Sequence, residues 1–233
     1  MHPAPLPAAV QSALATVEPP LVDLRRERLV VLDGAGRVQV TGQGDDHSVS
    51  PRRDEAHRLT CCAGRIVTHN HPQPGGTLSG ADLYLWAKEE CREVRAVTRL
   101  PDGHAVVYRV GFPARSVPRK GHTTVLDALA RGMYMREFHR IGNRRGYQDG
   151  QYLSLRQVLS LYDATVRSFA KEHGLGYACE PMHDVPRAAP YKDTAARAAS
   201  VLDALHELTP SAAARPMAAM TFAQALACAC GGQ

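Results

Sequence analysis

The sequence predicts an α/β domain followed by a helical extension, on the strength of two patterns. Through the first half of the chain, short runs of β-branched and apolar residues recur between turns rich in Gly, Asp and Pro, with one helical pattern among them. Beyond Pro118, longer helical stretches separated by Gly, Pro and Asn replace these runs. We therefore expect a flexible N-terminal arm over residues 1–20, an α/β domain over 21–118 and a helical extension over 119–233.

The expected elements follow in order along the chain. The arm is rich in Pro and Ala and holds at most one short helix around 10–17. Two strands form a hairpin across Asp33-Gly-Ala-Gly, and a polar loop then leads to a buried strand, a helix and two strands joined by Pro101-Asp-Gly-His. The strands are expected at 27–33, 37–41, 61–68, 94–100 and 105–110, and the helices at 80–91, 122–141, 154–173, 194–208 and 221–230.

Composition sets the class of protein. The chain has 233 residues, 44% of them hydrophobic, which is enough for one sizeable domain and an appendage. Its six cysteines are irregularly spaced, which is typical of reduced thiols in a cytosol; Cys228 and Cys230 lack a second pair and are interpreted as structural. The first residues lack a basic n-region and no eighteen apolar residues run together, so we expect a cytoplasmic protein without membrane contact.

A net charge of +5 permits contact with nucleic acid. The densest basic cluster lies on an expected helix end and the loop after it, and consists of Arg136, Arg140, Arg144 and Arg145. A solvated helix end accounts for it better than phosphate binding does, because cations are favoured at helix C-termini.

Two histidines at the end of a buried strand carry the clearest chemical signal. His69 and His71 flank one residue, and Asp82 follows eleven positions after His71, behind a Gly-rich turn that returns the chain past the strand. Two imidazoles and a carboxylate leave the fourth tetrahedral position of Zn²⁺ to water, which is the open arrangement of a catalytic zinc. Such a site lowers the pKa of water to roughly 7 and needs a general base and an oxyanion donor. Glu27 and Ser79 are the candidates.

This pattern resembles a known signature. His69-Asn-His71-Pro72, seven residues to Ser79, then Gly80-Ala81-Asp82 is similar to the H-x-H-x7-S-x2-D signature of JAMM (MPN+) zinc metalloproteases. The motif His-Asn-His-Pro most resembles that of the bacterial RadC-like and phage-associated branches. The resemblance covers roughly residues 22–112.

The resemblance implies an MPN/JAB-like (cytidine-deaminase-like) mixed sheet with flanking helices. It also implies Zn²⁺ held by His69, His71 and Asp82, with Glu27 as general base and Ser79 stabilising the oxyanion. Glu18 and Glu55 also precede the motif, but Glu18 lies among prolines and Glu55 in a polar loop. Two other interpretations stay open: Ser79 and Asp82 would also form a capping box, and Glu27 could be a strand-edge charge.

Three functions follow as hypotheses. The first is a zinc-dependent hydrolase that cleaves peptide or isopeptide bonds, with a protein or peptide substrate and a groove or partner surface formed by the helical extension. The second is a non-catalytic, metal-binding MPN-like interaction module. The third is a RadC-like, DNA-associated protein of phage or mobile-element origin, which the Arg136–Arg145 cluster would serve.

Overall fold

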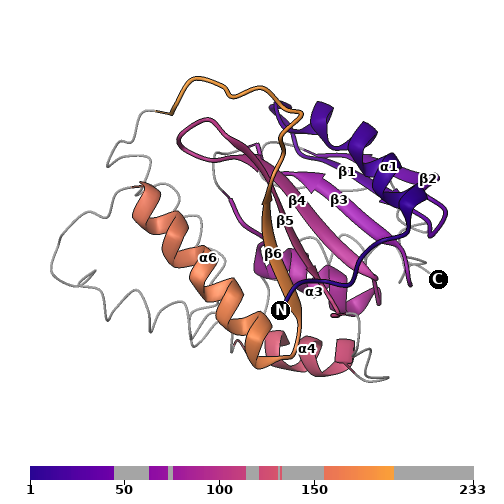
Figure 1. The fold of residues 1–233 in the computed structure, drawn as a ribbon. Helices are drawn as coiled ribbons and strands as arrows, with labels where there is room; N and C mark the ends of the chain where they lie inside the picture. Colours follow the sequence, from indigo (N-terminus) through magenta and orange to yellow (C-terminus); the bar gives the residue numbers. More distant parts are fainter. Residues whose placement is uncertain (45–62, 73–75, 114–120, 131, 133–154, 192–233) are drawn as a thin grey trace, which may run out of the picture.

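The computed structural model describes residues 1–44, 63–72, 76–113, 121–130, 132 and 155–191. Within them the chain forms one mixed six-stranded sheet with helices on both faces (Figure 1). The strands are β1 (Arg28–Leu32), β2 (Val38–Gln43), β3 (Ile66–Asn70), β4 (Glu93–Arg99), β5 (Ala105–Gly111) and β6 (Gly176–Pro181). The helices are α1 (Ala8–Val17), α3 (Gly80–Lys88), α4 (Gly121–Ala130) and α6 (Leu155–Glu172), with a 3-10 turn η1 (Pro19–Leu21).

The sheet has the order β2-β1-β3-β4-β5-β6. Its only parallel pair is β3 with β4, which α3 connects; every other neighbouring pair is antiparallel. The expected α/β class and the hairpin of β1 and β2 are therefore confirmed. The parallel pair matters for the site, because the chain leaves β3 at its C-terminal end and returns through α3 beside it.

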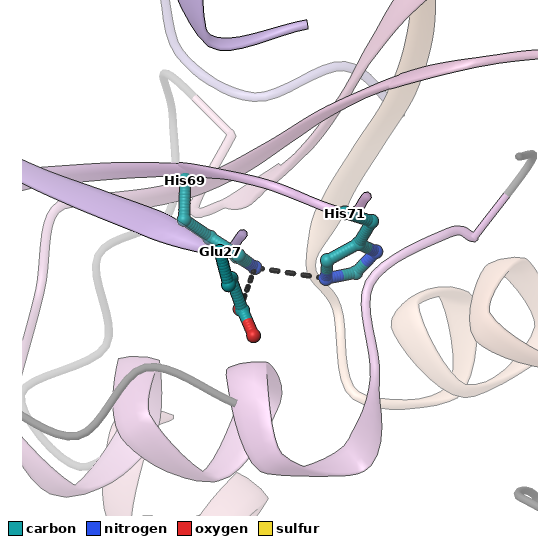
Figure 2. Close-up of side chains that lie close together, drawn as sticks. All are labelled: Glu27, His69 and His71. Carbon is teal, nitrogen blue, oxygen red and sulfur yellow. Dashed lines mark hydrogen bonds and ion pairs between the residues drawn. The ribbon is translucent and has the colours of Figure 1, made fainter. Parts of the chain in front are cut away.

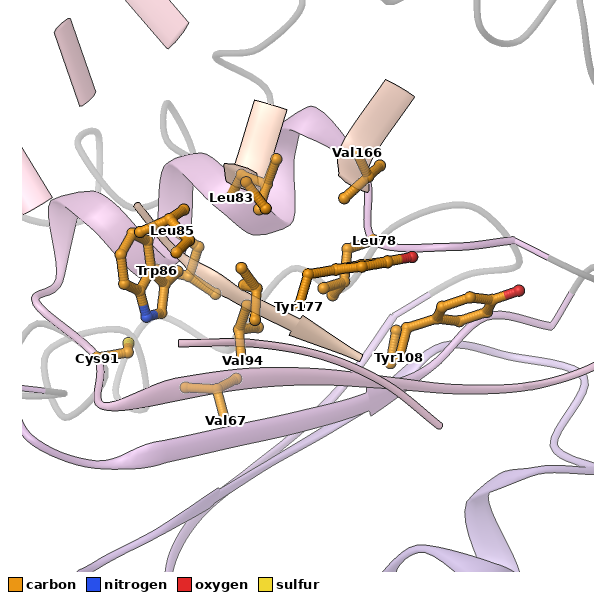
Figure 3. Packing of buried hydrophobic residues seen from close by; sticks show 14 of the residues in the cluster. Val67, Leu78, Leu83, Leu85, Trp86, Cys91, Val94, Tyr108, Val166 and Tyr177 are labelled. Atoms are coloured by element: carbon orange, nitrogen blue, oxygen red, sulfur yellow. The ribbon is translucent and has the colours of Figure 1, made fainter. Parts of the chain in front are cut away.

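The strands β1, β3, β4 and β5 are buried on both faces, and their apolar side chains alternate between two layers, as the period of two requires. On one face, Leu29 and Val31 join a core with α3, α4 and α6. Figure 3 shows the centre of this core, where Trp86 of α3 lies over the sheet residues Val67 and Val94. On the opposite face, Val30 and Leu32 pack beneath α1.

The N-terminal segment differs from the flexible arm expected over residues 1–20. Val10 and Leu14 of α1 are buried against the sheet, because their spacing of four places both side chains on one side of the helix. Backbone hydrogen bonds also tie the first residues to the sheet: Ala4 N donates to Phe112 O, and Tyr177 N donates to Met1 O. Only the short helix agrees with the expectation.

Two boundaries around the motif also differ. The strand expected at 61–68 begins at Ile66 and runs to Asn70, so His69 lies inside β3. The helix expected at 80–91 ends at Lys88. Just beyond this end, Glu90 takes a positive φ of 51° and Cys91 N donates a hydrogen bond to Trp86 O. This bond is a Schellman cap that closes the helix end.

The extension expected to be helical over 119–233 also contains a strand, β6. β6 was not expected, yet it pairs along the whole of β5 and makes the sixth strand. α4 and α6 share the core of α3, so residues beyond 118 complete the sheet domain. The regions expected to be helical at 194–208 and 221–230, and the remainder of 122–141 beyond α4 apart from Gly132, lie outside the described residues. Among the described helices, none combines the length and apolarity needed to cross a membrane.

Candidate metal centre

The five residues singled out from the sequence come from three elements that meet at one end of the sheet. Glu27 directly precedes β1, His69 lies in β3 and His71 follows it. Because β1 and β3 are antiparallel, with Leu29 opposite His69, the beginning of β1 lies beside the end of β3. Figure 2 shows the side chains of Glu27, His69 and His71 converging from these two strands.

The polar atoms of the motif lie close together. Nε2 of His69 is 2.9 Å from Nε2 of His71 and 3.0 Å from Oδ1 of Asp82, and Nε2 of His71 is 3.4 Å from Oδ2 of Asp82. Two ligands that bind one zinc ion at about 2.0–2.1 Å with tetrahedral angles are about 3.3 Å apart. The three spacings are close to this value, with the two that involve Asp82 made by different oxygens, so the side chains converge much as zinc ligands do.

Glu27 is the second carboxylate of the site. Its Oε1 lies 3.8 Å from Nε2 of His69, farther than Asp82 does. One ligand atom each from Glu27, His69 and His71 falls within 4.8 Å of the others, so this trio could also hold a metal ion. The two oxygens of Asp82 also approach both imidazoles, so Asp82 and Glu27 are both candidates for the third ligand.

The two imidazoles are held differently. Nδ1 of His71 lies 3.0 Å from the carbonyl oxygen of Gly76, so an N–H there donates to it and Nε2 is left for the metal. A Cβ at Gly76 would stand 3.0 Å from this Nδ1, so a side chain there would crowd the imidazole. Nδ1 of His69 is buried and has no partner among the described residues, whereas Nε2 of the same ring contacts His71, Glu27 and Asp82.

Electrostatics couple Asp82 to the histidines. Burial disfavours the charged form of His71, but the hydrogen bond and charge of Asp82 outweigh it and raise the pKa of His71 to about 9. Burial would raise the pKa of Asp82, and the adjacent His69 and His71 instead hold it well below its ordinary value. A cation at this point is therefore favoured, whether it is a proton or a metal ion.

Ser79 caps α3 as well as facing the site. Asp82 N donates to Oγ of Ser79 over 3.1 Å, and both Ser79 N and its hydroxyl donate to Oδ2 of Asp82, over 2.6 and 2.8 Å. This is the reciprocal capping box that the sequence allowed. The cap accounts for part of the motif on structural grounds, and it also fixes the Asp82 carboxylate toward the histidines.

Residues beyond 118 form hydrogen bonds with the chain just before Ser79. The hydroxyl of Tyr177 in β6 lies 2.7 Å from Oγ1 of Thr77 and also bonds Asp163 of α6. Residues beyond 118 thus fix the segment that follows the Gly-rich turn. Sequence reasoning missed this contact, since Thr77 and Tyr177 are 100 residues apart.

The opposite face of the sheet holds a second buried polar cluster that sequence reasoning also missed. Arg95 bonds both Glu18 and Glu93, and Arg109 bonds both Glu93 and Glu180, at 2.6–3.0 Å. The signal was present, because Glu93 and Arg95 stand two apart in one strand and so share a face. Glu18 is therefore bound on the other face from His69, which removes it as an alternative base.

The cluster borders a cavity of about 440 Å³ between α1 and the segment after β6. Its polar floor is Arg95 and Arg109, which are already engaged by carboxylates. The remaining expected residues, Glu55, Cys228, Cys230 and the Arg136–Arg145 cluster, lie outside the described part of the chain.

Comparison of the chain with protein-family models, curated proteins and solved structures gives no match. The likeness to JAMM metalloproteases therefore depends on the spacing of the motif together with the convergence of its side chains.

Proposed function

We propose that this chain is a zinc-dependent hydrolase of the JAMM type that cleaves peptide or isopeptide bonds in a protein or peptide substrate. One observation carries the proposal: Nε2 of His69, Nε2 of His71 and the Asp82 carboxylate converge at 2.9–3.4 Å, with the carboxylate of Glu27 next to them. A mixed sheet with helices on both faces is consistent with an MPN/JAB-like fold.

Each residue has a separate task in this mechanism. His69, His71 and Asp82 would hold a zinc ion, which would supply Lewis-acid activation of the attacking water and the scissile carbonyl. Glu27 accepts the proton of that water and returns it to the leaving amine. Ser79 donates to the developing oxyanion, for which its hydroxyl turns away from Oδ2 of Asp82.

The test separates the base from the metal ligands. Glu27→Gln keeps the size of the side chain and removes the proton acceptor. Hydrolysis of a panel of peptides and ubiquitin-like fusions should therefore fall by about 10²–10⁴-fold. Bound zinc, measured by elemental analysis, should stay near one per chain. Glu172→Gln, at an exposed position in α6, is the matched control. Unchanged hydrolysis in Glu27→Gln would exclude Glu27 as the base.

A non-catalytic metal-binding module is the second candidate, and the capping box favours it. Ser79 and Asp82 satisfy each other without any substrate, and metal bound at this site would stabilise the fold by mass action. Removal of zinc with a chelator should then lower the free energy of unfolding by about 2.7 kcal/mol relative to zinc at 100 times its Kd. That shift, with no hydrolysis across the panel, would favour the module; protein that binds no zinc would exclude both candidates.

A further inference from the structure

Asn70 stands between the two histidines in the sequence but faces away from them. Residues alternate across a strand, so His69 points to the α3 face while Asn70 points to the α1 face with Ile66 and Thr68. Asn70 is fully buried. A buried amide needs partners for its polar atoms, and those partners show what the residue does.

All the partners of the Asn70 side chain belong to the segment that carries Glu27. Its Oδ1 accepts from Arg28 N over 2.7 Å. Its Nδ2 donates to Leu24 O over 3.3 Å and to Arg26 O over 3.2 Å. The amide thus bonds the residues on both sides of Glu27 and uses both kinds of polar atom that it has.

The position of these bonds explains why they matter. The ladder between β1 and β3 stops at the pair Leu29 and His69, so the residues before Leu29 no longer pair with β3, although Arg28 still pairs with Gln43 of β2. The Asn70 side chain continues the attachment of this segment to β3 past that point. On the other side, Gly44 N donates to Glu27 O over 2.8 Å. The backbone of Glu27 is thereby held from two sides, which sets where its carboxylate lies.

We propose that Asn70 is a positioning residue that holds the Glu27 carboxylate beside His69, an inference that rests on the proposed function of this site. The Asn70 side chain has one acceptor and two donors, and it is long enough to form hydrogen bonds with all three backbone groups. Aspartate would keep the bond to Arg28 N and lose both donors, and serine would be too short to span the segment. Asn70 therefore acts through Glu27 and touches neither substrate nor metal.

The experiment is a double-mutant cycle read by the affinity of the full-length protein for Co²⁺, followed in its absorption spectrum. Glu27→Gln removes a negative charge near the metal. Asn70→Ala frees the Glu27 segment, so the same charge can move away from the metal. Each variant should weaken Co²⁺ binding by about 10-fold, as loss of a residue that contacts the metal ligands does. Because both act through one carboxylate, Asn70→Ala should have no further effect in the Glu27→Gln background. An additive loss of about 100-fold, or no effect of Asn70→Ala alone, would overturn the proposal.

The controls separate position from stability. Thr68→Val is the matched variant, because Thr68 is also fully buried on the same face of β3 and loses one hydrogen bond, to Glu18. It should leave Co²⁺ affinity unchanged. Thermal denaturation checks that each variant folds, and Asn70→Ser replaces Asn70→Ala in the cycle if the latter unfolds.

The failures of the two proposals are distinguishable. A coupled cycle in a protein that hydrolyses nothing would leave the role of Asn70 intact and remove the hydrolase reaction. An additive cycle in an active enzyme would remove the role of Asn70 alone. Wild-type protein that binds no Co²⁺ would overturn the metal centre and the positioning role with it.

Discussion

The two faces of the sheet carry two buried polar clusters that are built in opposite ways. On the α1 face, the arginines and carboxylates alternate, and each guanidinium bonds two carboxylates. On the α3 face, the carboxylates of Glu27 and Asp82 lie beside two imidazoles, whose charge depends on whether they are protonated. The cations of the first cluster are permanently charged, whereas the imidazoles of the second can be neutral and could then bind a metal ion.

This difference separates a structural cluster from a binding site. Buried charges persist when they are paired and hydrogen-bonded, and the pairing on the α1 face meets that need. On the α3 face, Asp82 raises the pKa of His71 to about 9, so a proton on His71 balances the Asp82 carboxylate at neutral pH and a divalent ion would take the place of that proton. We therefore expect changes on the α1 face to alter stability and changes on the α3 face to alter metal binding.

The largest expected effect is on stability, at Arg95. Arg95→Met leaves the buried carboxylates of Glu18 and Glu93 without their shared partner, so the free energy of unfolding in urea should fall by about 3–5 kcal/mol. Arg37→Met is the control, because the Arg37 side chain is 77% exposed and its ion pair with Asp33 contributes under about 1 kcal/mol. Zinc affinity of Arg95→Met should stay at the wild-type value under conditions where it folds. A loss of zinc affinity would show that the two clusters are coupled.

The next effect is on metal binding, at Asp82. Asp82→Asn keeps an oxygen for the helix cap and removes the charge, so zinc affinity measured by chelator competition should fall by more than about 100-fold, beyond the loss expected of an outer partner. Stability of the metal-free protein should change far less than in Arg95→Met. Asp102→Asn, at an exposed turn, is the matched control. Retention of zinc by Asp82→Asn, with loss in Glu27→Gln, would make Glu27 the third ligand.

The sequence indicated the two clusters unequally. The motif could be found because its residues have a fixed spacing and follow one strand, and Glu27 because it opens the neighbouring strand. Short local patterns of apolar and β-branched residues likewise predicted β1, β2, β4 and β5. The cluster around Arg95 could not be assembled in this way, since Glu18 and Arg95 are 77 residues apart.

The same reason applies to β6 and to Asn70. β6 is short, contains Glu180 and Pro181, and becomes a strand by pairing with β5, as in Val107 with Glu180. The partners of Asn70 lie 42–46 residues earlier in the chain. Local pattern therefore predicted the ligands and most strands, whereas the contacts that position them depend on long-range pairing.

The smallest expected effect is the pH dependence of metal binding. In the metal-free protein the pKa of His71 is raised from 6.5 to about 9, so its protonated form, paired with Asp82, stabilises the fold below pH 6.5 and this contribution is lost as pH rises through about 9. Zinc requires the neutral imidazole and displaces that proton. Between pH 7 and 8.5, zinc affinity should therefore rise by about tenfold per pH unit, with release of close to one proton in calorimetric titrations in two buffers. Asp82→Asn should lower the pKa of His71 and reduce the pH dependence of zinc affinity near pH 8. The control Arg37→Met should keep the wild-type pH dependence. An equal pH dependence in Asp82→Asn would show that Asp82 does not set the charge of the site.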